Sequence, residues 1–335
     1  MTQESKSESA GGIASEPLAL TVPDLAEAID FFTRRLGFRV EMIVPADAPH
    51  TSIISRQGMM LRLEAGSTQA QSYDYAVDSP ESARGFVISR LNNDAWHVGL
   101  AGMQYRDLIP GRLGGRVVAS HIRIPDGGET PDYVHYHKVL FQMIYCKAGW
   151  VRVVYEDQWP PFTLEAGDCV LQPPEIRHRV LESSPGLEVI EVGCPAAHET
   201  WADHELELPT REVLPERLFG GQRFVRHRAR EASWAPWRIE GCSACDAGIA
   251  AATNGLAAAR VVKSDSAITA TANGHAGELL FLFILQGELG IDSPTQENHQ
   301  LRAGDSCVIP AGVGYKLRAG AGLEMLEVSY NRPAS

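Results

Sequence analysis

Two histidines, His135 and His137, in the run VHYHKVLFQ are the residues with the clearest capacity for chemistry. In an extended strand alternate side chains share a face, so both imidazoles would point one way while Tyr136 points the other. Such a pair can bind one ion, because imidazole nitrogen is a common ligand of divalent transition metals. Gln142 follows five residues after His137, and His178 lies beyond a later turn. A metal site is therefore the first hypothesis for this part of the chain.

The segments that must position these side chains are rich in strand-forming residues. From about residue 116 onward, Gly, Pro and Asp turns recur every eight to twelve residues, which is typical of a β-sandwich or β-barrel. Two short sequences also return at nearly one offset, 137 and 136 residues. LEAGDCVLQP (164–173) returns as LRAGDSCVIP (301–310), and GLEVIEV (186–192) returns as GLEMLEV (322–328). The pattern predicts a duplicated β domain.

This duplication sets the predicted domain boundaries. We expect a first barrel over residues 116–195, a crossover over 196–221, and a second barrel over 222–331. Residues 1–15 are rich in Ser, Glu and Gly, which indicates a disordered tail. Residues 67–115 begin with a polar, turn-rich stretch, so we expect a linker and connecting segment there.

Residues 16–66 form a separate predicted unit. A short strand precedes a helix with apolar residues at helical spacing, Asp24 and Glu27 are placed as in a capping box, and three strands follow. This βαβββ order, with the phrase VPDLAEAIDFFTRRLGF, resembles one module of the glyoxalase and bleomycin-resistance family, the vicinal-oxygen-chelate fold. That family builds its metal site from two modules, and only one is present here. Pro17 stands at the first ligand position, although Glu64 matches the last, so we expect a packing or dimerisation module.

The histidine-bearing stretches and the duplication together resemble the paired motifs of the cupin superfamily. The resemblance implies a mainly β fold with two tandem double-stranded β-helix barrels. In that family the first motif supplies two histidines and a glutamate, and the second supplies another histidine. The matching residues here are His135, His137, Gln142 and His178. Gln142 replaces the usual glutamate, and Glu175 stands where the family usually has glycine.

The implied ligand set predicts one divalent metal ion per chain. Three imidazoles and an amide oxygen suit Fe(II), Mn(II), Ni(II), Co(II) or Zn(II), and the ligands alone do not choose among these ions. We prefer Fe(II). In the second barrel the same template, aligned on its own turn glycine, meets Asn273, His275, Leu280 and Tyr315. Because only one of these four is a plausible ligand, no metal is expected there.

The predicted function is that of a metal-dependent enzyme acting on a small organic molecule, and we favour a non-haem iron oxygenase or dioxygenase. The resemblance to cupin dioxygenases implies open coordination positions for substrate and oxygen. Since Gln142 is neutral, the metal keeps its full positive charge, which favours an anionic, chelating substrate. Two alternatives stay open. One is an isomerase or hydrolase with Glu175 or Tyr133 as the base, and the other is a non-catalytic barrel that binds a small molecule.

Composition argues against several classes of partner. Thirty basic and forty-two acidic residues give a net charge of −12 with no basic patch, which disfavours nucleic acid. The longest apolar run, 279–285, is too short to cross a membrane. Six scattered cysteines and the lack of a secretory leader indicate reduced thiols and a cytoplasmic location.

A lone βαβββ sheet has an open edge, which predicts a homodimer with the N-terminal modules in the interface.

Overall fold

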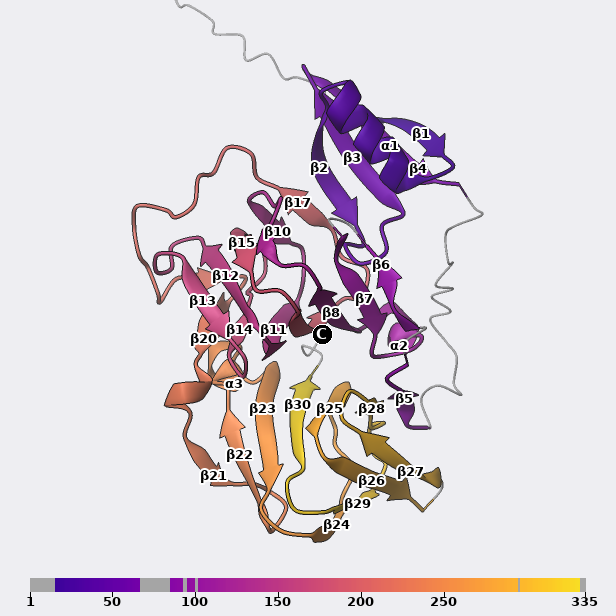
Figure 1. Ribbon diagram of the computed structural model, residues 1–335, viewed down its shortest axis with the longest axis vertical. Helices are drawn as coiled ribbons and strands as arrows, with labels where there is room; N and C mark the ends of the chain where they lie inside the picture. Colours follow the sequence, from indigo (N-terminus) through magenta and orange to yellow (C-terminus); the bar gives the residue numbers. More distant parts are fainter. Residues whose placement is uncertain (1–15, 67–84, 93–94, 100–101, 295, 332–335) are drawn as a thin grey trace, which may run out of the picture.

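The computed structural model describes residues 16–66, 85–92, 95–99, 102–294 and 296–331 (Figure 1). The predicted N-terminal tail and residues 67–84 of the predicted linker lie outside this part of the chain. Within the described residues the fold is mainly β with short helices, as expected. None of the described helices is long and apolar enough to span a bilayer. The six cysteines are all free.

The N-terminal module has the predicted strand, helix and three strands. Its elements are β1 (Leu18–Val22), α1 (Leu25–Asp30) continued by a π-helical turn (Phe31–Arg35), β2 (Arg39–Val44), β3 (Thr51–Arg56) and β4 (Met59–Ala65). The side chain of Asp24 caps α1 by accepting a hydrogen bond from the backbone N–H of Glu27 at 2.9 Å. Leu25 of the helix packs in one core with Ile54 and Leu63 of the sheet. The helix and its cap are therefore confirmed, while the resemblance to the glyoxalase family stays a prediction.

Two sheets that face each other form the first barrel. Its elements are β6 (His97–Val98), β7 (Gln104–Asp107), α2 (Arg112–Gly115), β8 (Val118–Ile124), β9 (Gly128–Glu129), β10 (His135–His137), β11 (Phe141–Ala148), β12 (Trp150–Tyr155), β13 (Phe162–Glu165), β14 (Cys169–Leu171), β15 (His178–Ser183), β16 (Leu187–Cys194) and β17 (Thr200–Ala202). One sheet runs β17–β10–β15–β12–β13, and the other runs β14–β11–β16–β8–β7–β6. The sheets meet around a hollow interior that holds the candidate site.

The second barrel repeats this strand order. Its elements are β21 (Trp234–Pro236), β22 (Cys242–Asp246), α3 (Ile249–Ala252), β23 (Ala257–Ser264), β24 (Ile268–Ala272), β25 (Leu279–Gln286), β26 (Glu288–Ser293), β27 (Gln296–Arg302), β28 (Ser306–Val308), β29 (Tyr315–Ala319) and β30 (Glu324–Tyr330). The order β14–β11–β16–β8 of the first barrel returns as β28–β25–β30–β23. Gly149 and Gly287 occupy equivalent turns with φ of +74° and +80°, a backbone region that favours glycine. The predicted duplication is confirmed.

Each barrel receives one strand from the other half of the chain. β5 (Val87–Ser89) precedes the first barrel in sequence but pairs with β28 of the second. β20 (Val225–His227) follows the crossover but pairs with β14 of the first. Between the halves lie the hairpin of β18 (Leu218–Phe219) and β19 (Gln222–Arg223) and, after β20, a 3-10 turn (Ala229–Glu231). β5 thus lies in the segment predicted to be a connection, and β20 lies in the range predicted to belong to the second barrel. Both strands have only three residues, which is too few to show a readable alternation.

A shared core joins the two barrels. Phe141 and Met143 of β11 are at most 1% exposed and lie in one apolar cluster with Phe281 of β25. Burying side chains of this size stabilises the native state by about 2 kcal/mol each. Because strand residues alternate, the intervening Gln142 and the following Ile144 point into the first barrel and line its cavity.

The sheet of the N-terminal module continues into the first barrel (Figure 1). β2 pairs with β17, and β17 pairs with β10, so that Ile43 lies opposite Thr200. The β2 edge is therefore covered within the chain by the first barrel and is not free to pair with a second copy. A buried ion pair supports the same junction, because the Arg112 guanidinium contacts Asp47 and Asp107. The homodimer stays a prediction, with β1 as the module's remaining edge.

An Asp47→Asn substitution should destabilise the junction between module and barrel. Arg112 is 1% exposed, and the substitution removes the negative charge of Asp47 while the contact to Asp107 at 3.4 Å stays. Removing one partner of a buried pair costs about 3 kcal/mol. Urea unfolding should show this loss. Asp30→Asn, in the exposed Asp30–Arg34 pair, is the control and should change little. Equal effects of the two substitutions would contradict the role of the junction.

Candidate metal centre

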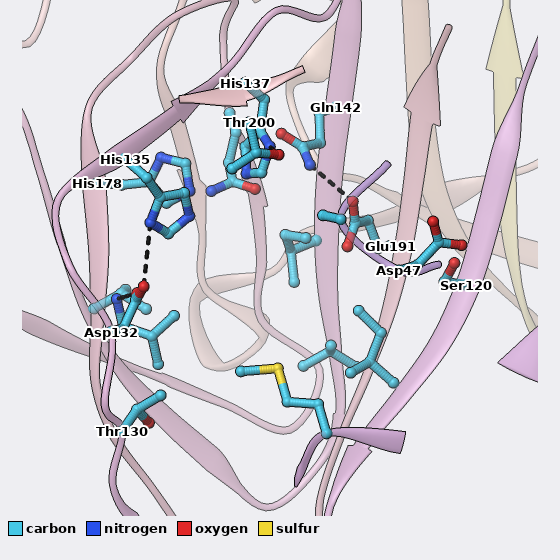
Figure 2. Close-up of a pocket in the computed structure, with 18 of the residues that line it drawn as sticks. Asp47, Ser120, Thr130, Asp132, His135, His137, Gln142, His178, Glu191 and Thr200 are labelled. Atoms are coloured by element: carbon cyan, nitrogen blue, oxygen red, sulfur yellow. Dashed lines mark hydrogen bonds and ion pairs between the residues drawn. The ribbon is translucent and has the colours of Figure 1, made fainter. Parts of the chain in front are cut away.

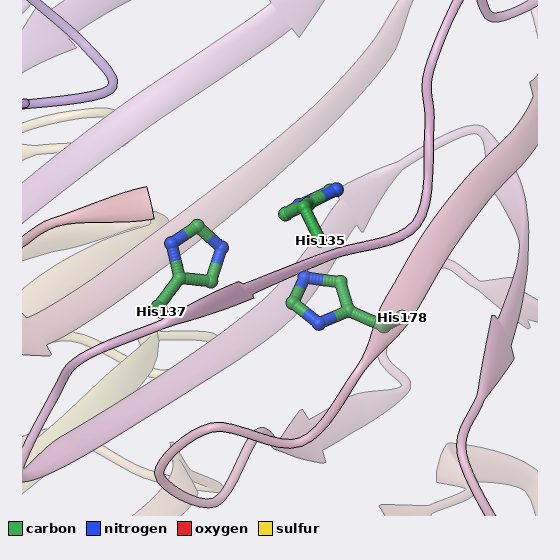
Figure 3. A group of neighbouring side chains, drawn as sticks. All are labelled: His135, His137 and His178. Atoms are coloured by element: carbon green, nitrogen blue, oxygen red, sulfur yellow. The ribbon is translucent and has the colours of Figure 1, made fainter. Parts of the chain in front are cut away.

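Strand pairing brings three histidines to one point. β10 and β15 are antiparallel with His135 opposite His178, and His137 lies two residues along the same face of β10. The ring centroids are 4.3 Å apart for His135 and His178, 5.2 Å for His135 and His137, and 5.1 Å for His137 and His178. One nitrogen from each ring lies within 4.8 Å of the others (Figure 3). As predicted, Tyr136 points away and stacks beneath the Arg177 guanidinium.

The backbone and one threonine fix which nitrogen of each ring faces the centre. Nδ1 of His135 donates to the carbonyl of Tyr133 at 2.9 Å, and Nδ1 of His178 donates to that of Ile176 at 3.0 Å. A carbonyl can only accept, so Nδ1 carries a proton in both rings, and the neutral form of each ring has its lone pair on Nε2. Nδ1 of His137 bonds Oγ1 of Thr200 at 2.9 Å. Orientation of the ligand rings by such partners is typical of protein metal sites.

The pKa shifts of the three histidines bear on their ability to bind a metal ion. Burial lowers the pKa of His178 to about 3 and that of His137 well below its ordinary value, and the neighbouring imidazoles add to both shifts. Burial acts in the same direction on His135, but the hydrogen bond and charge of Asp132 outweigh it and raise that pKa. Metal ligation requires the neutral imidazole, which the site already favours at two of the three positions.

Gln142 supplies a fourth polar group. Its Nε2 donates to Oε1 of Glu191 at 2.8 Å, which fixes the orientation of the amide (Figure 2). Its Oε1 is buried and has no hydrogen-bond partner among the described residues. An unpaired buried oxygen is costly unless something binds it, and a metal ion would satisfy it. The side chains present therefore fit a divalent ion held by His135, His137 and His178 with the amide oxygen nearby.

These groups line a cavity of about 400 Å³ inside the first barrel. Figure 2 shows His135, His137, Thr200 and Gln142 close together, while Asp132 and Thr130 lie farther along one side and Asp47 and Ser120 lie on the other. The rest of the wall consists largely of aliphatic residues from β8, β12 and β16. Burial raises the pKa of the Glu191 carboxyl at this wall, while the hydrogen bond from Gln142 acts in the opposite direction. The cavity therefore combines a cluster of histidine and amide side chains with a wall that is largely aliphatic.

The two residues proposed as bases lie in different places. Tyr133 lines the cavity, and burial raises its pKa to about 12, so the phenol stays protonated and can donate a hydrogen bond. Glu175 lies in the turn before β15 with φ of +61°, and its backbone N–H donates to the carbonyl of His137. Its side chain is exposed and does not line the cavity. The structure therefore does not bring Glu175 to the site, because the conformation of the turn directs it outward.

Several site residues were missed by the sequence analysis. His198 lines the cavity and is 6% exposed, its Nδ1 donates to the carbonyl of Pro195 at 2.9 Å, and its Nε2 is buried without a partner among the described residues. Glu191 lies on the repeated segment GLEVIEV, and counting alternate residues along that strand could have found it. Thr200, on the predicted crossover, carried no signal, because its role depends on the pairing of β17 with β10.

Among the described residues, the counterparts of the histidine triad in the second barrel do not converge on one point. The histidine triad is the only potential metal-binding group found in this part of the chain. Nε2 of His275 bonds the carbonyl of Ile309 at 2.7 Å. Leu280 and Tyr315 belong to the apolar cluster that fills the barrel. The Arg238 guanidinium bonds Tyr315 at 3.1 Å and the buried Glu327 at 2.8 Å, so a fixed cation neutralises the counterpart of Glu191.

Comparison with known proteins agrees with this architecture. Residues 120–192 match the family model described as "Cupin domain". Oxalate decarboxylase from Lactobacillus farciminis, in a formate complex, aligns with a TM-score of 0.54 at 15% identity over 74% of this chain and 87% of that one. A mutant of salicylate 1,2-dioxygenase from Pseudoaminobacter salicylatoxidans aligns with a TM-score of 0.52 at 14% identity over 68% and 75%. No curated protein sequence matches the chain. The first barrel thus contains a cupin domain, and the whole has the fold of two tandem cupin barrels.

The protein should bind one divalent ion per chain when saturated. A His178→Ala substitution should remove most of the metal, since it deletes one of three converging nitrogens. His275→Ala should leave the metal content unchanged, because that ring bonds a backbone carbonyl in the other barrel. Elemental analysis of protein purified without chelators measures this. Two ions per chain, or full occupancy in His178→Ala, would contradict the assignment.

The hydrogen bond between Gln142 and Glu191 can be tested by exchanging the two side chains. Gln142→Glu replaces it with a contact between two buried carboxylates, and the metal-free protein should lose about 1 to 3 kcal/mol of stability. The double exchange Gln142→Glu with Glu191→Gln restores an amide-to-carboxylate bond and should recover most of that loss. Thermal unfolding in the presence of a chelator gives the comparison. A stable single variant would show that the bond does not order the site.

Proposed function

We propose that this protein is a metal-dependent enzyme that holds one divalent ion, preferably Fe(II), at His135, His137 and His178. The convergence of one nitrogen from each of the three rings, whose Nδ1 atoms are hydrogen-bonded to neighbouring groups, is the observation that carries the proposal. Mn, Ni, Co and Zn are the alternative ions, because neutral nitrogen ligands bind all of them. Gln142 lies beside the same point with an unpaired amide oxygen.

The reaction we favour is oxygenation or dioxygenation of a small organic substrate that chelates the metal. Bound Fe(II) would supply the one-electron chemistry that dioxygen requires. The chain itself supplies the surroundings. The aliphatic wall excludes water, and the protonated phenol of Tyr133 donates a hydrogen bond into the cavity. His198 also lines the cavity, with its Nδ1 bonded to the carbonyl of Pro195.

An isomerase or hydrolase is the second candidate, and Glu191 is the observation that favours it. Its carboxylate lies on the cavity wall, where it could move a proton on a bound carbonyl compound. This carboxylate takes the place of Glu175, whose side chain lies outside the cavity. A barrel that binds a small molecule without turnover is the non-enzymatic alternative.

Measuring oxygen consumption distinguishes an oxygenase from an isomerase or hydrolase and from a binding protein. Fe(II)-loaded protein should take up oxygen when supplied with its substrate from a panel of enolisable, phenolic and carboxylic compounds. His178→Ala should abolish the uptake, and His275→Ala should retain it, because only the first substitution removes a ligand. Substrate turnover without oxygen uptake would instead identify an isomerase or hydrolase. Binding without turnover would identify a binding protein.

A further inference from the structure

The charged side chains on the wall of the candidate metal cavity are all acidic. Its charged side chains are Asp47, Asp132 and Glu191, and no lysine or arginine lines it among the described residues. Asp47 is paired with Arg112 behind the wall, and Asp132 bonds His135. A bound metal would therefore be the one strong positive charge that a ligand meets. A second anionic group on the ligand would face carboxylates or aliphatic carbon, which is unfavourable in both cases.

Away from the histidines, much of the cavity is lined by apolar side chains. Ile122 of β8, Val151 and Val153 of β12, and Val189 of β16 all line it and are 5 to 8% exposed. Side chains with this small residual exposure border a space that a ligand can occupy. A ligand with only polar atoms would leave this surface uncovered, whereas an aromatic ring or a branched alkyl group would bury it.

The N-terminal module completes this apolar wall. Val40 and Ile43 of β2 line the same cavity as the histidines. Ile43 lies directly opposite Thr200 in the β2–β17 pair, and side chains opposite each other in a sheet lie on one face. The module is thus fixed beside the residue that orients His137. The surface that meets the ligand's apolar part therefore comes from both the barrel and the module.

We propose that the ligand of this site has a single chelating head, neutral or singly charged, and an apolar body about the size of an aromatic ring. The N-terminal module selects for that body through Val40 and Ile43. This inference rests on the proposed function, since it needs a metal at the histidine triad. The expected substrate therefore has little polar surface away from the metal. The N-terminal module takes part in substrate specificity.

Two hydroxamates that share one chelating head test the ligand class. The protein loaded with Co(II), whose visible spectrum reports ligand exchange, is titrated with acetohydroxamate, benzohydroxamate and oxalate. Benzohydroxamate should bind at least about tenfold more tightly than acetohydroxamate, because its ring buries apolar surface in the cavity. It should also bind more tightly than oxalate, which has no apolar body. Equal affinities for the two hydroxamates, or a preference for oxalate, would overturn the inference while leaving the metal-dependent function intact.

Substitutions in the module test its part in selection. Val40→Ala and Ile43→Ala should each weaken benzohydroxamate binding about threefold or more and leave acetohydroxamate binding and the cobalt content unchanged. Met42→Ala is the matched control, because Met42 lies between them on β2 and does not line the cavity. It should leave both affinities unchanged. Equal losses for both probes, or an effect of Met42→Ala as large as the others, would overturn selection by the module. No spectral change with any probe, in protein holding one cobalt per chain, would overturn the proposed function as well.

Discussion

The alternation of side chains along β11 and β16 is the constraint on which the rest of the molecule depends. Both strands have one face in the core between the barrels and the other in the metal cavity. Phe141 and Met143 point outward, and Gln142 lies between them and points inward. A slip of one residue would exchange these faces and place an amide in the apolar core. Packing between the barrels therefore also fixes the register of the site.

The candidate metal centre is assembled from segments that are distant in sequence. β10 contributes two histidines and β15 the third, while β17 contributes Thr200, which orients His137. β17 also carries the sheet onward to β2 of the N-terminal module. The same strand thus supports a ligand on one side and a wall of the cavity on the other. This explains how residues of the N-terminal module come to line the cavity of the barrel.

The second barrel shares its strand order with the first barrel but differs from it in the residues that fill the interior. The strand order, the turn glycine and the buried glutamate persist, with Glu327 at the position of Glu191. The interior is filled by aliphatic side chains, and the guanidinium of Arg238 neutralises Glu327. A packed interior and a fixed cation stabilise this barrel without a metal. Its outer face then serves as the support against which the metal barrel packs.

The sequence by itself determined the features that depend on local spacing. The alternation of His135 and His137, the two repeated segments, the cap of α1 by Asp24 and the loss of ligands in the second barrel could all be read from neighbouring residues. They could be read because strand and helix periods, and identities at one offset, are short-range properties.

Tertiary structure alone decided which distant segments meet. It assigned β5 and β20 to the opposite barrels, joined the module to the metal barrel through β17, and brought Thr200 and His198 to the cavity. It also turned Glu175 outward. Strands of three residues carry too little pattern to reveal their partners, and the direction of a turn side chain depends on the backbone around it. These features follow from the free energy of the whole packed chain, which no single segment encodes.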